Sequence, residues 1–343
     1  MHRRILAAIA ASSGLLVALL TVAVPVSAQT SVQGGDGLRV SPVRSDLTIK
    51  PGQNSSLSVS VTNVSSSPTQ LKAIINDFGA GDDESGQPKV YLDENASAPT
   101  HGLKNYITKI DNFTLQPQER KEIKVTIRIP ANAGGGGYYG VVRFAPVSVS
   151  GKENVTLSGS VGTLVLVTVP GNVIEKASLD TFNVARMNGS TLGKASNFFT
   201  NGGKDSKGKG IQTVLRIHNA GNVQLAPFGK VILKKGGSQV ASYEFNNTVP
   251  KNVVLPDSTR RFQIDLGDKA ASFGRYTIEG NFGYGANGQL LSASTSFYVV
   301  PVPYLVAAIV LLLLVVAAII IVPRMLKSHD RKLLRRIRSR GKR

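Results

Sequence analysis

The feature that most constrains this chain is an uncharged apolar run near its end. Residues 305–322 consist only of Leu, Val, Ile and Ala. As a helix this run reaches about 27 Å, enough to cross the hydrocarbon of a bilayer. A buried helix of a soluble domain normally shows a polar stripe, and this run has none. Tyr304 precedes it, where an aromatic residue suits the membrane interface. The sequence therefore predicts a transmembrane helix over residues 303–323.

A strongly basic tail follows, over residues 324–343. It holds ten Lys or Arg residues against one acid, Asp330. The positive-inside rule predicts that this tail is cytoplasmic and that the preceding domains are extracellular. Because the tail carries about half of the net charge of +19, the charge does not indicate nucleic-acid binding. The tail is interpreted as a stop-transfer signal, with contact to anionic inner-leaflet lipid as an alternative.

The N-terminus resembles a secretory signal. Residues 1–28 combine Arg3 and Arg4 with an apolar run and a small-residue site, which predicts cleavage between Ala28 and Gln29. An uncleaved anchor is the alternative. The chain has no cysteine, whereas a eukaryotic ectodomain of this size usually has disulfides. We therefore expect a bacterial single-pass protein of the plasma membrane.

Between these ends the pattern is that of strands. Residues 57–62, 123–128 and 262–266 alternate apolar and polar side chains, and residues 163–169 form a continuous apolar run typical of a strand covered on both faces. Gly, Pro, Asn and Ser clusters separate them. The predicted fold class is all-β: two tandem Ig-like antiparallel β-sandwiches over residues 38–171 and 172–300.

The two halves repeat a sequence pattern. Asn63, a Leu-x-Pro turn and Tyr139 in the first half match Asn219, a Leu-Pro turn and Tyr276 in the second, which predicts two copies of one plan. The first half has an additional acidic stretch, residues 79–106. Long loops on rigid sandwiches often carry binding surfaces.

Groups that support catalysis are scarce. Without cysteine and with only His101 and His218 in the ectodomain, a zinc site or a nucleophile–histidine pair is not expected. The sequence predicts a non-enzyme with no cofactor and no metal site; whether the acidic stretch binds calcium stays open, because the loop spacing for calcium is absent. A remote alternative is a hydrolase that uses the acids of that stretch, which are Asp82, Asp83, Glu84, Asp93 and Glu94.

A glycine run at residues 134–140 matches G-x-G-x-x-G. A dinucleotide loop must open a helix, but this one continues into the extended residues 141–144. It is interpreted as a freely turning segment before a strand. Because the chain has no tryptophan, tyrosine rings are the candidates for ligand contact, and these are Tyr138, Tyr139, Tyr106 and Tyr91.

The segment IPANAGGGGYYGVVRF at residues 129–144, with LQPQERK at 115–121 and VSP at 40–42, resembles the first domain of the WxL-interacting surface proteins. The resemblance implies a signal peptide, two Ig-like domains, a membrane span and a basic tail. It also implies that the first domain associates with peptidoglycan and that the second meets host or partner proteins.

These observations predict a membrane-anchored bacterial surface protein. Its expected role is non-enzymatic binding or adhesion to cell-wall glycan (peptidoglycan) or to another surface protein, with no nucleic-acid partner. The alternative is a surface assembly or secretion accessory that acts by β-strand addition. An open edge strand in the first domain would favour that alternative.

Overall fold

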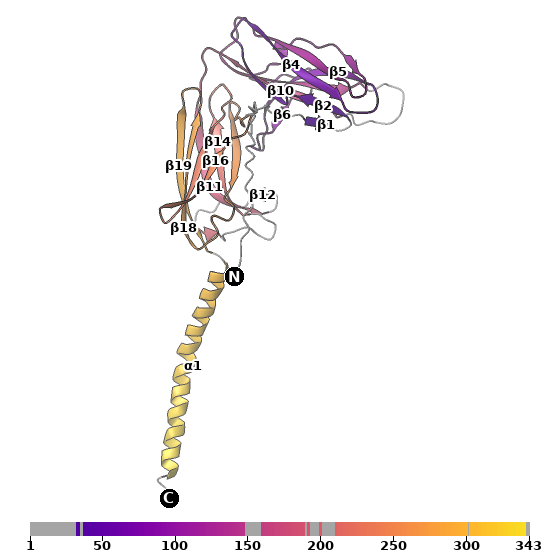
Figure 1. Cartoon of the computed structure of the whole chain (residues 1–343). Helices are drawn as coiled ribbons and strands as arrows, with labels where there is room; N and C mark the ends of the chain where they lie inside the picture. Colours follow the sequence, from indigo (N-terminus) through magenta and orange to yellow (C-terminus); the bar gives the residue numbers. More distant parts are fainter. Residues whose placement is uncertain are drawn as a thin grey trace, which may run out of the picture.

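The computed structural model describes residues 32–34, 37–147, 159–188, 191–192, 199–200, 210–300 and 302–340. Two β-sandwiches follow one another along the chain, and a long helix leaves the second (Figure 1). The first sandwich lies across the end of the second that is remote from the helix. The predicted signal peptide and the Ala28–Gln29 cleavage site lie outside the described residues.

The first sandwich consists of a four-stranded and a larger sheet. The smaller sheet has the order β1-β2-β4-β8, and the larger has β3-β10-β9-β5-β6 with β7 also paired to β5. The strands are β1 (Val32–Gly34), β2 (Leu38–Ser41), β3 (Arg44–Thr48), β4 (Asn54–Asn63), β5 (Thr69–Ala80), β6 (Pro88–Val90), β7 (Phe113–Leu115), β8 (Arg120–Arg128), β9 (Gly136–Pro146) and β10 (Val161–Val169). The acidic stretch contains β6 and a 3₁₀ turn, η1 (Lys104–Tyr106).

The second sandwich has the same plan. Its sheets have the orders β12-β11-β14-β17 and β13-β19-β18-β15-β16. The strands are β11 (Ala177–Asn188), β12 (Thr191–Leu192), β13 (Phe199–Thr200), β14 (Ile211–Asn219), β15 (Phe228–Lys235), β16 (Ser238–Phe245), β17 (Ser258–Asp265), β18 (Gly274–Tyr284) and β19 (Gln289–Val299). In both sandwiches an early strand pairs in parallel with the last one, β3 with β10 and β13 with β19. The repeat predicted from the sequence is confirmed by this shared order.

A buried asparagine closes each sandwich at the same place. Asn63 ends β4 and Asn219 ends β14, and neither side chain is exposed. Asn219 Nδ2 donates to the carbonyl oxygens of Val223 and Val254, and its Oδ1 accepts from the Gly221 amide. Asn63 makes the equivalent bonds to its own turns. A short amide side chain with two donors and an acceptor satisfies several loop groups at once, which explains the repeated Asn.

A tyrosine corner also recurs. The hydroxyl of Tyr138 donates to the Gly134 carbonyl, and the hydroxyl of Tyr276 donates to the Ser272 carbonyl, four residues upstream in both cases. A glycine with φ near +145° stands two residues before each tyrosine, Gly136 and Gly274. The second domain therefore reproduces the local geometry of the first as well as its topology. The match of Tyr139 with Tyr276 predicted from the sequence is wrong by one residue, because the corner in the first domain belongs to Tyr138.

The C-terminal helix α1 (Val302–Arg340) contains one stretch that is long and apolar enough to cross a membrane, Tyr304–Met325. The span predicted over residues 303–323 stays a prediction; the helix itself continues through Pro323. A proline removes one intrahelical bond.

We predict that Asn219→Ala lowers the free energy of unfolding by about 2–3 kcal/mol, because buried carbonyl groups lose their donors. The measurement is urea unfolding of the detergent-solubilised full chain, followed by circular dichroism. The matched control is Asn95→Ala, at an exposed asparagine, for which we expect less than about 0.5 kcal/mol. Equal effects of the two substitutions would contradict the structural role of Asn219.

Candidate binding cleft between the sandwiches

The larger sheet of the first domain is apolar on both faces. Val165 and Val167 of β10 point into the core between the two sheets, as the continuous run at 163–169 predicts. Leu164 and Leu166 point outward and join a second cluster, which includes Phe78. Val253 and Leu255 of the second domain pack against that cluster. The second sandwich is thus the cover for the outer face of the first.

The glycine run lies at this domain junction. The Gly137 amide donates to the Asn222 carbonyl at 2.7 Å, and Asn222 Nδ2 donates to the Gly135 carbonyl at 3.0 Å. A Cβ on Gly136 would lie 2.8 Å from the Asn222 carbonyl oxygen. The interpretation as a freely turning segment is therefore wrong: β9 begins at Gly136, and the glycines admit the backbone of the second domain.

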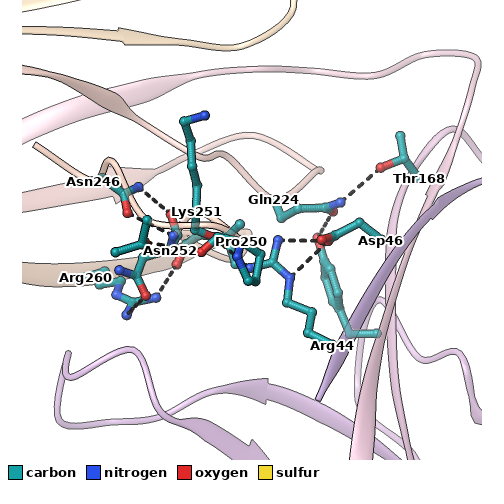
Figure 2. Close-up of polar contacts among 12 residues, drawn as sticks. Arg44, Asp46, Thr168, Gln224, Asn246, Pro250, Lys251, Asn252 and Arg260 are labelled. Carbon is teal, nitrogen blue, oxygen red and sulfur yellow. Dashed lines mark hydrogen bonds and ion pairs between the residues drawn. The ribbon is translucent and has the colours of Figure 1, made fainter. Parts of the chain in front are cut away.

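Tyr139 belongs to the same junction. Its side chain is 2% exposed, and its hydroxyl donates to Gln224 Oε1 at 2.9 Å. Gln224 Nε2 in turn donates to Thr168 Oγ1 (Figure 2). Burial raises the pKa of Tyr139, so the hydroxyl stays protonated as the donor. This relay joins β9, the second domain and β10.

The acidic stretch makes a further connection. Glu84 accepts hydrogen bonds from the Arg216 guanidinium, one of them at 2.8 Å, and its carbonyl accepts from the Arg261 amide. The hydrogen bond from Arg216 lowers the pKa of Glu84 below its usual value of 4.5. Glu84 has φ of +59° and the nearby Gly86 has φ of +80°, so the turn is bent tightly onto β14 and β17. This turn acts as a clamp between the domains.

Between these contacts a cleft of about 440 Å³ remains. Its first-domain wall comes from the β2–β3 crossover, β5, β10 and the acidic stretch; its other wall is the 249–260 segment of the second domain. Most lining side chains are apolar. The apolar lining includes Phe78, Leu164, Leu166, Val249, Val253 and Leu255.

Two guanidinium groups line the cleft as well. Arg44 donates to the Lys251 carbonyl and to Asp46, and Arg260 donates to the Val253 carbonyl and to Asn252 Oδ1 (Figure 2). The Nε of Arg260 is buried without a hydrogen-bond partner among the described residues. Burial and then the charge of Arg44 lower the pKa of Arg260, although an arginine stays charged. The cleft is therefore apolar inside and cationic on one side.

The segment that carries these groups is held by an asparagine. Asn246 Nδ2 donates to the carbonyl oxygens of Pro227 and Asn252, and its Oδ1 accepts from the Asn252 amide. Val249 lies in this segment and is 91% exposed at the cleft. The internal bonds fix the loop that forms the second wall.

The tyrosines predicted to contact a ligand do not line the cleft. Tyr106 and Tyr138 lie together, with ring centroids 5.6 Å apart, and Tyr138 also serves its corner. Tyr91 is half-buried beside Gly79. Tyr139 contacts protein almost entirely. For the other three, ligand contact stays a prediction.

The acids proposed for a hydrolase are all engaged in local contacts. Glu84 is bound by Arg216 as described. The other contacts are Asp82 with Lys89, Asp83 with Ser85, Asp93 with the Asn95 amide and Glu94 with Lys72. Among the described residues no group of three or more His, Cys, Asp or Glu is placed to hold a metal ion.

Sequence reasoning missed the residues of the cleft. The available signal was the run at 163–169, because an apolar outer face at Leu164 and Leu166 requires a cover. The covering residues of the second domain gave no such signal, since Val253 and Leu255 stand in a Pro- and Asn-containing turn.

No known protein family and no curated protein matches this chain. Among solved structures it is similar to the class 5 fimbriae chaperone CfaA, with 14% identity, a TM-score of 0.37 and coverage of 77% of this chain and 99% of that one. The E. coli chaperone DraB is 12% identical, with a TM-score of 0.34 and coverage of 77% of this chain and 97% of that one. The Pseudomonas aeruginosa chaperone CupB2 is 12% identical, with a TM-score of 0.31 and coverage of 74% of this chain and 97% of that one. At such TM-scores and identities the likenesses carry no argument about function.

The Glu84–Arg216 contact predicts a pH dependence. Because the pKa of Glu84 is lowered in the folded protein, the contact stabilises the folded state fully above pH 4.5. This stabilisation is lost as the pH falls from 4.5 through the lowered pKa of the folded state. We expect Glu84→Gln to lower the thermal unfolding midpoint at pH 7. The difference in midpoint between the variant and the wild type should shrink below pH 4.5.

The matched control is Glu94→Gln, the same change in an exposed ion pair with Lys72. Exposed pairs contribute about 0–1 kcal/mol, so its midpoint should follow the wild type throughout. A Glu84→Gln gap that is independent of pH would show that the carboxylate charge is not involved.

Proposed function

We propose that this chain is a membrane-anchored, non-catalytic surface protein that binds an extended segment of a protein partner in the interdomain cleft. The observation that carries the proposal is the apolar cleft of about 440 Å³ between two sandwiches that are fixed against each other. Pockets at domain junctions with apolar walls and a few polar groups are typical binding sites.

The lining distinguishes a protein partner from a glycan. Sugars are bound through many polar groups and exposed flat rings. Among the described residues that line the cleft, the one aromatic ring belongs to Phe78, which is 3% exposed. Leu164, Val253 and Leu255 instead suit aliphatic side chains of a peptide segment. Arg44 and Arg260 add a preference for an acidic group beside the apolar contacts.

The membrane segment determines where the cleft is presented. The Tyr304–Met325 stretch anchors the chain, and the basic end supports a cytoplasmic tail with both sandwiches outside. The cleft is formed in part by the first sandwich, which lies across the end of the second sandwich that is remote from α1 (Figure 1). A partner from the cell surface or the wall can therefore approach it. This arrangement also agrees with the resemblance to WxL-interacting surface proteins, which itself stays a prediction.

A second candidate function, strand addition, is favoured by a different observation. In the first domain β3 covers the last strand over Leu164–Thr168 and carries Arg44 and Asp46, so that edge is protected. In the second domain, within the described residues, β13 reaches only Tyr298 and Val299 of β19. Residues 289–297 contain no charge and no proline. Such an edge is a suitable template for a partner strand.

The two candidates are separated by substitutions at the two places. With a photo-cross-linking residue at the exposed cleft position Gln87, we expect a discrete adduct with one partner protein in intact cells. Leu164→Arg should abolish it, because an unpaired buried charge costs several kcal/mol and lowers affinity by more than about tenfold. Val249→Glu should weaken it without affecting the fold, since Val249 is 91% exposed.

The control is Val240→Glu on β16, an exposed valine outside the cleft, which should leave the adduct unchanged. Ser294→Lys places a charge on the β19 edge, where it blocks strand pairing. Loss of the adduct with Ser294→Lys but not with Leu164→Arg would support strand addition instead. Binding to cell-wall sacculi that survives both cleft substitutions would favour a glycan.

A further inference from the structure

The end of the second sandwich from which α1 leaves is held close to the membrane. β19 ends at Val299 and α1 begins at Val302. The apolar stretch of α1 begins at Tyr304. At about 3.3–3.6 Å per residue, the short connection spans only about 10 Å even when extended. The strand ends at this side of the sandwich therefore lie at the height of the lipid headgroups.

The strand register shows which segments share this end. Gly274, at the start of β18, pairs with Val299, so the 266–273 connection lies here. Lys235 pairs with Tyr276 in the same region, which places the β15–β16 turn beside it. Lys235 Nζ donates to Ser272 Oγ and lies 5.5 Å from the Tyr276 ring centroid, which joins the turn to the connection.

An exposed aromatic ring projects from that connection. Phe273 is 57% exposed, and its ring centroid lies 5.9 Å from that of Tyr304, which is 62% exposed. One ring belongs to the soluble domain and the other opens the membrane-spanning stretch. Aromatic side chains are favoured at the boundary between water and hydrocarbon. An apolar ring at this height is stabilised by leaving water for the lipid surface.

We infer that Phe273, together with Tyr304, binds the interfacial region of the outer leaflet and seats the second sandwich on the bilayer. The partner is the lipid surface that α1 itself enters. The inference rests on the proposed membrane topology but not on the cleft. Its consequence is a restricted tilt of the sandwich, which keeps the cleft directed away from the membrane.

The charges at this end indicate an apolar rather than an electrostatic contact. Lys269 and Arg275 are exposed cations, but Asp268 stands beside Lys269. Lys234, from the adjacent strand, is paired with Glu279, and Lys235 is bonded to Ser272. With so little excess positive charge, anionic lipid is not required. The contact should form on zwitterionic bilayers and should persist at high salt.

The chain contains no tryptophan, so Phe273→Trp creates a single fluorescent reporter at the proposed contact. The full chain is incorporated in phosphatidylcholine nanodiscs, with or without lipids brominated about 5–10 Å below the headgroups. We expect a blue-shifted emission that loses most of its intensity with brominated lipid. The matched control is Val249→Trp at the cleft, 91% exposed, which should emit as in water and remain unquenched.

Other outcomes overturn the inference in distinguishable ways. Emission from the Phe273→Trp variant that matches the control in correctly incorporated protein would show that the ring does not meet lipid. A blue shift without bromine quenching would mean that protein, such as a second copy, covers it. Quenching that requires phosphatidylglycerol and low salt would replace the aromatic contact by an electrostatic one. Failure of the chain to enter nanodiscs would instead refute the anchoring on which the inference rests.

Discussion

The larger sheet of the first domain has two apolar faces, and the arrangement of the two sandwiches depends on covering both. Alternate residues of β10 point to opposite sides, so Val165 and Val167 require one cover while Leu164 and Leu166 require another. The smaller sheet covers the inner face. The second sandwich covers part of the outer face, and burial of each large side chain contributes about 1.5–3 kcal/mol. The cleft is the part of that face which the cover leaves accessible.

The second sandwich can dock closely on the first only where the first has no side chains that would clash. The glycines at 135–137 supply such a surface, because the backbone of Asn222 approaches within hydrogen-bonding distance of them. The same approach brings Gln224 onto Tyr139. Each contact alone is modest, at about 0.5–1.5 kcal/mol for a neutral hydrogen bond. Together they select one relative position of the domains, so the two walls of the cleft keep a defined separation.

Much of the architecture was predictable because it follows local periodicity. The alternating strands, the repeated Asn–Pro–Tyr pattern and the apolar span each depend on residues close in sequence. The cleft depends on packing between residues far apart in sequence, such as Val253 against the cluster of Phe78 and Leu166. A single sequence does not show which distant residues meet. Adjacent Tyr138 and Tyr139 show the same limit: both were candidates for ligand contact, but neighbours in a strand face opposite sides. Tyr138 forms the tyrosine corner of the first domain, and Tyr139 bonds to Gln224 at the domain junction.

The two sandwiches share one strand order but differ at the edge of the larger sheet beside the last strand. The difference arises from where the chain crosses from the smaller sheet to the larger one. In the first domain β2 lasts four residues before the chain crosses at Pro42 and covers β10 with β3. In the second, β11 stays on one sheet for twelve residues, and within the described part only two residues of β13 reach β19. Because β19 runs toward α1, an antiparallel second copy would need its own helix to point away from the same membrane. An antiparallel partner strand at this edge is therefore not β19 of a second copy in the same membrane.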